Sequence, residues 1–279
     1  MMRSFHQFAC SEETLSGTLD QGDKSTGLLI VSGGNEIKAG AHAGMAKLAQ
    51  TIAAQGFPVF RYDRRGIGES SGTNHEFLGS EADIFTAAQY FRQATPHVDK
   101  VIAFGNCDAA TALALFGKEA PINGFLLANP WAIETADNSA SDAPTVPPPS
   151  AIRSRYWERL KNPQSLIDLF TGKIDLRKLA SGLKQATQKQ ENTGLSMRLK
   201  DGLESINKPC RILLANKDTT ARAFLAAWNS KDFAATRALP NITSESIDSA
   251  SHSFADDRSK KWLESQILET LNRTLLFSR

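Results

Sequence analysis

Several features that would place this chain in a special class of protein are missing from its sequence. Its 279 residues include three cysteines, Cys10, Cys107 and Cys210, and no CxxC pair, so neither a zinc site nor a disulfide framework is expected. No apolar run is long enough for a signal peptide at the start of the chain or for a transmembrane helix later. These absences predict a cytoplasmic protein with no membrane insertion, no metal and no cofactor.

The sequence also lacks an excess of either positive or negative charge. The sequence has 32 basic and 30 acidic residues, a net charge of +2, which gives no electrostatic reason to expect nucleic acid as a partner. Hydrophobic residues make up 41% of the chain, which is sufficient for the core of one large domain with an insertion. We therefore expect a monomer or homodimer whose partner is a small-molecule substrate.

Short apolar runs alternate with longer segments of helical periodicity through most of the chain. Strands are predicted at 27–32, 57–62, 98–104, 122–128, 211–215 and 242–247, and helices at 42–55, 80–93 and 262–275. Such alternation is typical of a parallel sheet with crossover helices. The pattern predicts an α/β fold with a mostly parallel central sheet and flanking helices.

This alternation stops between residues 134 and 207. The segment opens with a polar, proline-rich stretch at 136–150 and continues with a helical pattern that includes Trp157 and has no strand signal. Its apolar face needs a surface to cover, which predicts a helical lid between a first core part, 1–133, and a second, 208–279. The alternative is a disordered linker followed by a pair of surface helices.

The most informative stretch is VIAFGNCDAATA at 101–112. It predicts a strand, a tight turn and a helix, with Cys107 at the apex between the small residues Gly105 and Ala109. The helix would direct its amide N–H groups at the apex side chain and favour the thiolate over the thiol. Cys107 is the predicted nucleophile; the alternative is a small buried hydrophobic residue.

Two downstream residues complete a candidate triad. Asp218 comes just after the predicted strand at 211–215, and His252 lies in the loop after the last strand. The carboxyl ends of parallel strands meet at one edge of a sheet, so these residues can converge despite their separation. His252 is the predicted base and Asp218 the orienting acid. As alternatives, His252 is a surface residue, Asp218 only caps a helix, and Asp248 or Glu134 is the acid.

Acyl transfer also requires donors for the developing oxyanion. The backbone N–H of Asp108, directly after the nucleophile, is one predicted donor. The second is expected from Gly34 or Asn35, in the glycine-rich loop after the first predicted strand. Trp131 and Trp157 are the predicted substrate contacts.

A second motif, GESSG at 68–72, matches the G-x-S-x-G pattern of a serine nucleophile. That motif requires a strand, a turn and a helix in succession. The residues that follow, TNHEFLGS, do not begin a helix at once, so Ser70 is predicted to have a structural role.

With these residues identified, the chain resembles the α/β-hydrolase superfamily over nearly its whole length and, more narrowly, the bacterial exosortase A system-associated hydrolase 1 family. The matching pieces are GAH at 40–42, GFPVFRYDRRGIGESSG at 56–72, GNCDAATA at 105–112, NPW at 129–131, KDTTARAF at 217–224 and SHSF at 251–254. The resemblance implies the nucleophile, acid and base roles for Cys107, Asp218 and His252. It also implies a cytoplasmic protein encoded beside exopolysaccharide and protein-sorting functions. Ser251 and Ala43 stand where the family leads us to expect an acidic residue and an arginine.

The predicted function is hydrolysis of an ester or thioester through a Cys-His-Asp triad and a covalent acyl-enzyme, with the lid forming the acyl pocket. Two alternatives stay open. One is an acyltransferase that passes the acyl group to a sugar hydroxyl by the same triad. The other is a non-catalytic partner protein that retains the hydrolase fold.

Overall fold

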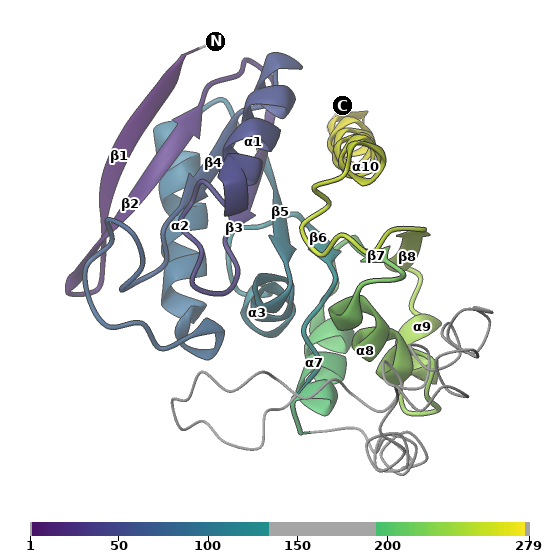
Figure 1. The fold of residues 1–279 in the computed structure, drawn as a ribbon. Coiled ribbons are helices and arrows are strands. Elements are labelled where there is room, and N and C mark those ends of the chain that lie inside the picture. The colour runs from purple at the N-terminus through teal and green to yellow at the C-terminus, as the bar shows by residue number, and fades with distance from the viewer. Residues whose placement is uncertain (1, 134–193, 277–279) are drawn as a thin grey trace, which may run out of the picture.

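The computed structural model describes residues 2–133 and 194–276. Its eight strands form one sheet in the order β1-β2-β4-β3-β5-β6-β7-β8 (Figure 1). The strands are β1 (Arg3–Cys10), β2 (Glu13–Asp20), β3 (Thr26–Val31), β4 (Val59–Tyr62), β5 (Lys100–Asn106), β6 (Gly124–Ala128), β7 (Cys210–Ala215) and β8 (Ile242–Ile247). The strands from β3 to β8 pair in parallel. This arrangement confirms the predicted mostly parallel sheet.

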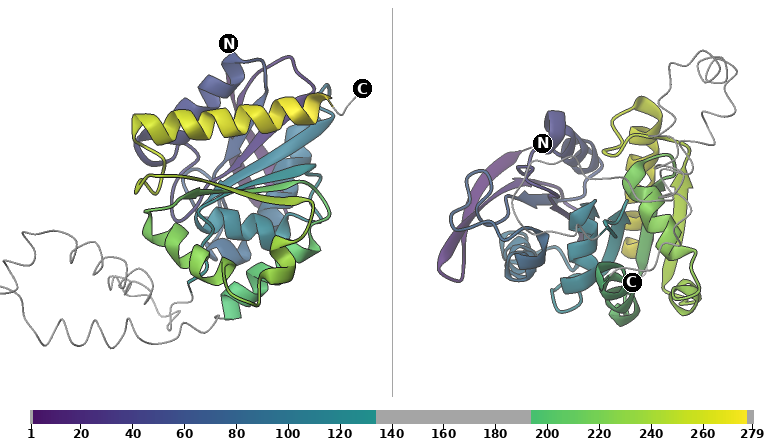
Figure 2. Two further views of the ribbon diagram at one scale, coloured as in Figure 1. Left: turned by 90° about the vertical axis from the view of Figure 1, so that its right-hand side faces the viewer. Right: turned by 60° about the horizontal axis from the view of Figure 1, so that its bottom comes forward.

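Helices cover both faces of the sheet (Figure 2). They are α1 (Gly44–Ala54), α2 (Glu81–Ala94), α3 (Asp108–Phe116), α7 (Gly194–Ser205), α8 (Thr219–Trp228), α9 (Ala234–Arg237) and α10 (Asp257–Leu276), with short 3-10 turns at Ala41–Ala43 and Phe77–Gly79. Helices α1 and α10 pack on one face, and α2, α3, α7 and α8 pack on the other. Leu28 and Ile30 of β3 face the first pair of helices, while Leu29 and Val31 face the second set. Burial on both faces explains why this strand is a continuous apolar run.

The N-terminal hairpin of β1 and β2 is the part of the sheet that the sequence analysis does not predict. The two strands pair antiparallel, and β2 pairs antiparallel with β4. Strand β1 buries only Phe8 and Cys10, and Phe5 is 77% exposed. A half-exposed edge strand has no continuous apolar run, and the Ser11-Glu12 turn has no glycine or asparagine to signal a hairpin.

Helix α7 falls inside the predicted insertion 134–207. Its residues Leu199 and Leu203 are fully buried in the apolar core beside α3. Residues 134–193 of the predicted insertion, including Trp157 and Glu134, lie outside the described residues.

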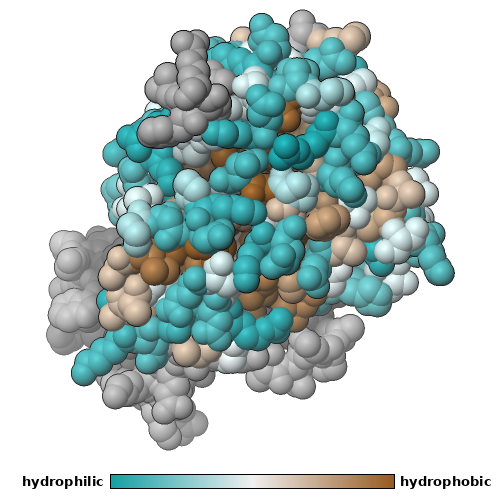
Figure 3. All heavy atoms as spheres, turned by 180° about the vertical axis from the view of Figure 1, so that it is seen from behind, coloured by the Kyte–Doolittle hydropathy of each residue, from teal (hydrophilic) through white to brown (hydrophobic). Residues whose placement is uncertain are grey.

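The face seen from behind is mostly hydrophilic, with apolar side chains visible between polar ones (Figure 3). Among the helices of the two described segments, none has both the length and the apolar character needed to cross a membrane.

Candidate active site

Cys107 stands alone between the end of β5 and the start of α3. Its backbone has φ 62° and ψ −127°, a conformation that a non-glycine residue adopts only when its surroundings enforce it. Two hydrogen bonds do so: the Cys107 N–H donates to the Ala128 carbonyl at 2.9 Å, and the Trp131 N–H donates to the Cys107 carbonyl at 3.2 Å. The turn is therefore strained, and the end of β6 holds it in place.

Steric crowding explains why small residues flank the turn. A Cβ on Gly105 would lie 2.7 Å from the backbone carbon of Ala109 and 2.8 Å from its oxygen. Helix α3 thus begins almost in contact with the end of β5, and a side chain at position 105 would force the two apart. This close approach is what lets the chain reverse within one residue and present the thiol.

His252 and Asp218 are in direct contact. The His252 Nδ1 lies 3.0 Å from Asp218 Oδ2, and the same oxygen accepts the Ala221 N–H at 3.0 Å. The carboxyl group therefore caps α8 and orients the imidazole at once. Burial would raise the pKa of Asp218, but the hydrogen bonds with His252 and the Ala221 amide bring its pKa below the ordinary value.

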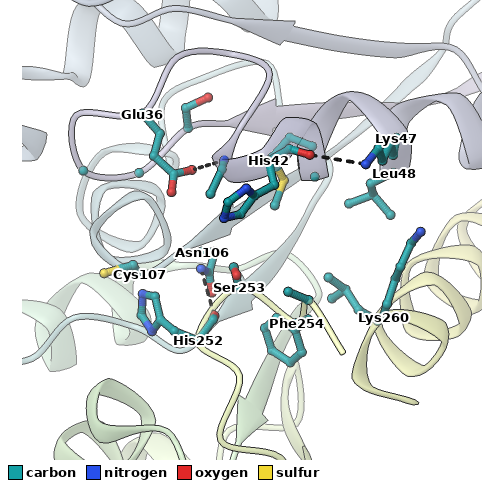
Figure 4. Close-up of a pocket in the computed structure, with 18 of the residues that line it drawn as sticks. Glu36, His42, Lys47, Leu48, Asn106, Cys107, His252, Ser253, Phe254 and Lys260 are labelled. Atoms are coloured by element: carbon teal, nitrogen blue, oxygen red, sulfur yellow. Dashed lines mark hydrogen bonds between the residues drawn. The ribbon is translucent and has the colours of Figure 1, made fainter. Parts of the chain in front are cut away.

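The imidazole also faces the thiol. The pKa of His252 is raised from 6.5 to about 10, first by its hydrogen bond with Asp218 and next by its hydrogen bond with Cys107, against the opposing effect of burial. The ring is therefore a cation at neutral pH. Cys107 and His252 lie beside each other at one end of the cavity (Figure 4). A neighbouring imidazolium favours the thiolate.

Asp248, the alternative acid, and Ser70, the alternative nucleophile, have other interaction partners. The Asp248 carboxylate is exposed and accepts a hydrogen bond from Lys217 at 3.0 Å. The Ser70 hydroxyl is buried, where it donates to the Asp63 carbonyl at 2.7 Å and accepts the Ser16 N–H at 2.9 Å. Ser70 thus fastens its loop to β2, in agreement with its predicted structural role.

The predicted oxyanion donors show an arrangement that the sequence does not suggest. The Gly34 N–H donates to Asp108 Oδ1 at 2.6 Å. Arg64 donates to the Gly34 carbonyl, and its guanidinium lies 3.8 Å from Asp108 Oδ2. The Asn35 side chain accepts a hydrogen bond from Asn74 at 2.9 Å. The N–H of Asp108, at the first position of α3, has no intrahelical acceptor.

A cavity of about 270 Å³ opens beside the thiol. Its walls come from the loop after β3, the end of β5, the loop before α10, and the first turns of α1 and α10. Cys107 and His252 lie at one end, and Lys47 and Lys260 at the other (Figure 4). Trp131 does not line this cavity and packs against the apolar core instead.

Two asparagines hold the loop that carries the histidine, and the sequence analysis gives neither a role. The side-chain amides of Asn106 and Asn129 donate to the His252 carbonyl at 3.2 and 3.0 Å. Asn129 also accepts the Ala215 N–H at 2.9 Å and so ties the ends of β6 and β7 together. Asparagine after a strand is common in ordinary turns, so its position alone gave no functional signal.

Comparison with known proteins agrees with this architecture. A family model described as serine aminopeptidase, S33 (Hydrolase_4), matches residues 25–258. No curated protein sequence matches the chain at a significant level.

Three solved structures are similar in fold. An esterase from Pyrococcus furiosus has a TM-score of 0.64 and 15% identity over 98% of this chain and 91% of its own. The α/β hydrolase GrgF from Penicillium sp. sh18 has a TM-score of 0.63 and 15% identity over 99% of this chain and 100% of its own. A thioesterase domain from the curacin biosynthetic pathway has a TM-score of 0.56 and 13% identity over 96% of this chain and 100% of its own. At such identities the likeness establishes the fold alone.

Proposed function

The chain belongs to the α/β-hydrolase family described as serine aminopeptidase, S33, and from this premise we propose that it cleaves an ester or thioester through an acyl-enzyme on Cys107. The observation that carries the proposal is the His252 ring, held between the Asp218 carboxylate and the Cys107 thiol. The esterase and the thioesterase domain of the same fold support this substrate class by analogy.

The chemistry proceeds in two halves. The Cys107 sulfur attacks the carbonyl carbon, and the π electrons of the C=O bond move to the oxygen. When the tetrahedral intermediate collapses, the bond to the leaving alcohol or thiol breaks, and His252 gives that group its proton. Water then loses a proton to His252 and attacks the acyl carbon. The second intermediate expels Cys107 as thiolate, and the acid product leaves.

The oxyanion is held by backbone donors. The Asp108 N–H is the first, because it directly follows the nucleophile. Gly34 is the better placed of the two candidates for the second, since it lines the cavity and Asn35 does not. The Gly34 N–H already binds the Asp108 carboxylate, so this carboxylate has to release it when the oxyanion forms.

The setting of the reaction is part of the proposal. The resemblance to the exosortase A system-associated hydrolase 1 family supports a role linked to bacterial exopolysaccharide and exosortase systems, without naming the substrate. Of the predicted lid, 134–207, the part that precedes α7 stands as the candidate cover of the acyl group, and with it Trp157 as a substrate contact.

Intact-mass spectrometry with a p-nitrophenyl ester tests the proposal. We expect a burst of p-nitrophenol of about one per active site and an acyl adduct that maps to Cys107. Both should be absent from Cys107→Ala. Equal turnover by the parent and this variant would exclude Cys107 as the nucleophile. Acceleration by an added sugar, with transfer of the acyl group to it, would indicate an acyltransferase. The complete absence of turnover and adduct with ester and thioester panels would favour the non-catalytic alternative.

A further inference from the structure

The end of the cavity away from the thiol has a charge pattern of its own. Lys47 comes from the first turns of α1, and Lys260 from the first turn of α10, and both line the same cavity. Figure 4 shows the two side chains on the same side of the cavity, opposite Cys107 and His252. The acyl chemistry described above uses neither lysine.

The lysines are not neutralised by the residues around them. Lys47 Nζ makes one long hydrogen bond, 3.4 Å to the His42 carbonyl. Within residues 2–133 and 194–276, Lys260 Nζ has neither a hydrogen-bond nor an ion-pair partner. Glu36 is the acidic residue in the cavity lining, and Figure 4 places it on the side of Cys107 and His42. Its carboxylate accepts the Ala41 N–H at 3.3 Å.

The helix that carries Lys47 adds to this positive potential. Helix α1 has 11 residues, its N-cap residue Ala43 makes no side-chain capping bond, and its first turn holds no acidic residue. Gly44 and Met45, at its start, line the cavity. Two of its first N–H groups are already bonded, Gly44 to the Ala41 carbonyl and Ala46 to the Ala39 carbonyl. The start of α1 therefore contributes the positive end of the helix dipole, which favours a negative charge nearby. The first turn of α10 is different, because the Asp256 carboxylate accepts the Ser259 N–H at 2.9 Å.

The backbone at this wall is also strained. His42 and Ala43 have φ values of 50° and 57°, although neither is glycine. Such conformations cost energy and tend to persist where a binding site requires them. Here they turn the chain so that the His42 ring points into the cavity between its two ends (Figure 4).

We propose that this end of the cavity binds an anionic group of the substrate, a carboxylate or a phosphate. We call Lys47, Lys260 and the start of α1 the anion subsite. The inference rests on the proposed function, since the subsite and the nucleophile share one cavity. An anion bound there belongs to the same molecule as the reacting carbonyl, so the substrate is an ester or thioester with a negative charge at one end.

Two substrate pairs test the subsite and separate the two sources of charge. For charge on the acyl side, p-nitrophenyl hydrogen suberate is compared with its neutral methyl ester. For charge on the leaving group, octanoyl-pantetheine 4′-phosphate is compared with octanoyl-pantetheine. We expect the charged member of one pair to have a kcat/KM about five- to tenfold above its neutral partner, and this preference should shrink at high salt.

Variants then assign the preference to the lysines. Lys47→Met and Lys260→Met keep the length of the side chain and remove its charge, and each should lose most of the preference, mainly through KM. Hydrolysis of the neutral substrates, which bring no charge to the subsite, should fall less than that of the charged substrates. Lys261→Met is the matched control, because Lys261 is exposed, adjacent to Lys260 and absent from the cavity wall.

Calorimetric binding to Cys107→Ala keeps the test independent of turnover. Pantetheine 4′-phosphate is compared with pantetheine, and methyl hydrogen suberate with dimethyl suberate. Tighter binding of one charged ligand that depends on Lys47 and Lys260 supports the subsite, even if the parent hydrolyses nothing. Equal use of charged and neutral substrates in Cys107-dependent turnover would overturn the subsite and leave the proposed function standing. Equal binding of all four ligands, or a charge preference that Lys261→Met removes as well, would also overturn it.

Discussion

The two sides of the active site are prepared to different degrees. On the side of the last strands, two residues of the proposed triad are already in contact, with Asp218 bonded to His252 at 3.0 Å and two asparagines fixing the His252 carbonyl. On the side of the loop after β3, the Gly34 N–H is occupied by the Asp108 carboxylate at 2.6 Å. The base of the proposed nucleophile is therefore already oriented, whereas the Gly34 N–H, a proposed oxyanion donor, is bound to the protein's own Asp108 carboxylate.

This difference has a physical reason. The proposed triad residues follow the ends of parallel strands, and Asp218 and His252 are held by backbone and side-chain hydrogen bonds. The glycine-rich loop is held instead by the side chains of Asp108, Arg64 and Asn74. Substrate binding is therefore expected to change the loop side more than the triad side.

The largest effect that distinguishes the two sides is loss of the nucleophile. Cys107→Ala should lower kcat/KM for a p-nitrophenyl ester by about a thousandfold or more, because the proposed acyl-enzyme forms on this sulfur. Cys210→Ala is the control: burial raises the pKa of the Cys210 thiol to about 12, so that thiol takes no part in chemistry at neutral pH. Loss of activity in Cys210→Ala without a change in melting temperature would contradict the account.

Removing the orienting charge should have the next largest effect. Asp218→Asn keeps the shape of the side chain but cannot hold His252 as a cation, and we expect a loss of about a hundredfold to ten-thousandfold in kcat. Asp248→Asn, at the rival carboxylate that pairs with Lys217, should stay within about twofold of the parent. The reverse order of these two variants would assign the acid role to Asp248.

The loop that carries the histidine should be sensitive to its asparagine clamp. Asn129→Ala removes a fully buried amide that bonds to His252 and Ala215. We expect a loss of about 1–3 kcal/mol in the free energy of unfolding and a decrease in kcat of about tenfold, with KM little changed. An unchanged kcat in the folded variant would show that the clamp does not position the ring.

On the loop side, removing the negative charge of Asp108 should increase the reactivity of Cys107 rather than decrease it. Asp108→Asn keeps an acceptor for the Gly34 N–H but removes a negative charge beside the nucleophile. Alkylation of the Cys107 thiol below about pH 6, where protonation slows it in the parent, should become severalfold faster, while the unpaired Arg64 lowers the free energy of unfolding. Slower alkylation would mean that Asp108 supports the nucleophile rather than opposing it.

The smallest effect is on the pH dependence of stability. The pKa of His252 is about 10 in the folded protein against 6.5 unfolded, so its stabilising contribution is complete below pH 6.5 and is lost as the pH rises to about 10. The ring's side chain is 41% exposed, so solvent screening keeps this contribution small. Chemical denaturation across this pH window should show a shallower decline in His252→Gln than in the parent.

The sequence predicts the triad side far better than the loop side. Most of the parallel strands are buried on both faces, and their apolar runs mark them to within about two residues. The edge strand β8 buries only Ile242 and Ile247. The strand-end rule then predicts that Asp218 and His252 converge. The β1–β2 hairpin escapes this method because its first strand is half exposed. The hydrogen bond between the Gly34 N–H and Asp108 is not predicted, because no sequence pattern indicates which side chain accepts a hydrogen bond from a loop's backbone N–H.

The pH profile of Cys107 alkylation by iodoacetamide, followed by peptide mass mapping in the parent and in His252→Gln, tests the pairing of thiolate and imidazolium most directly. The account predicts a rate in the parent that is nearly flat between about pH 6 and 9, and a rate in His252→Gln that follows ordinary thiol titration near about 8.5. A parent whose rate rises with that same titration, indistinguishable from His252→Gln, would contradict it.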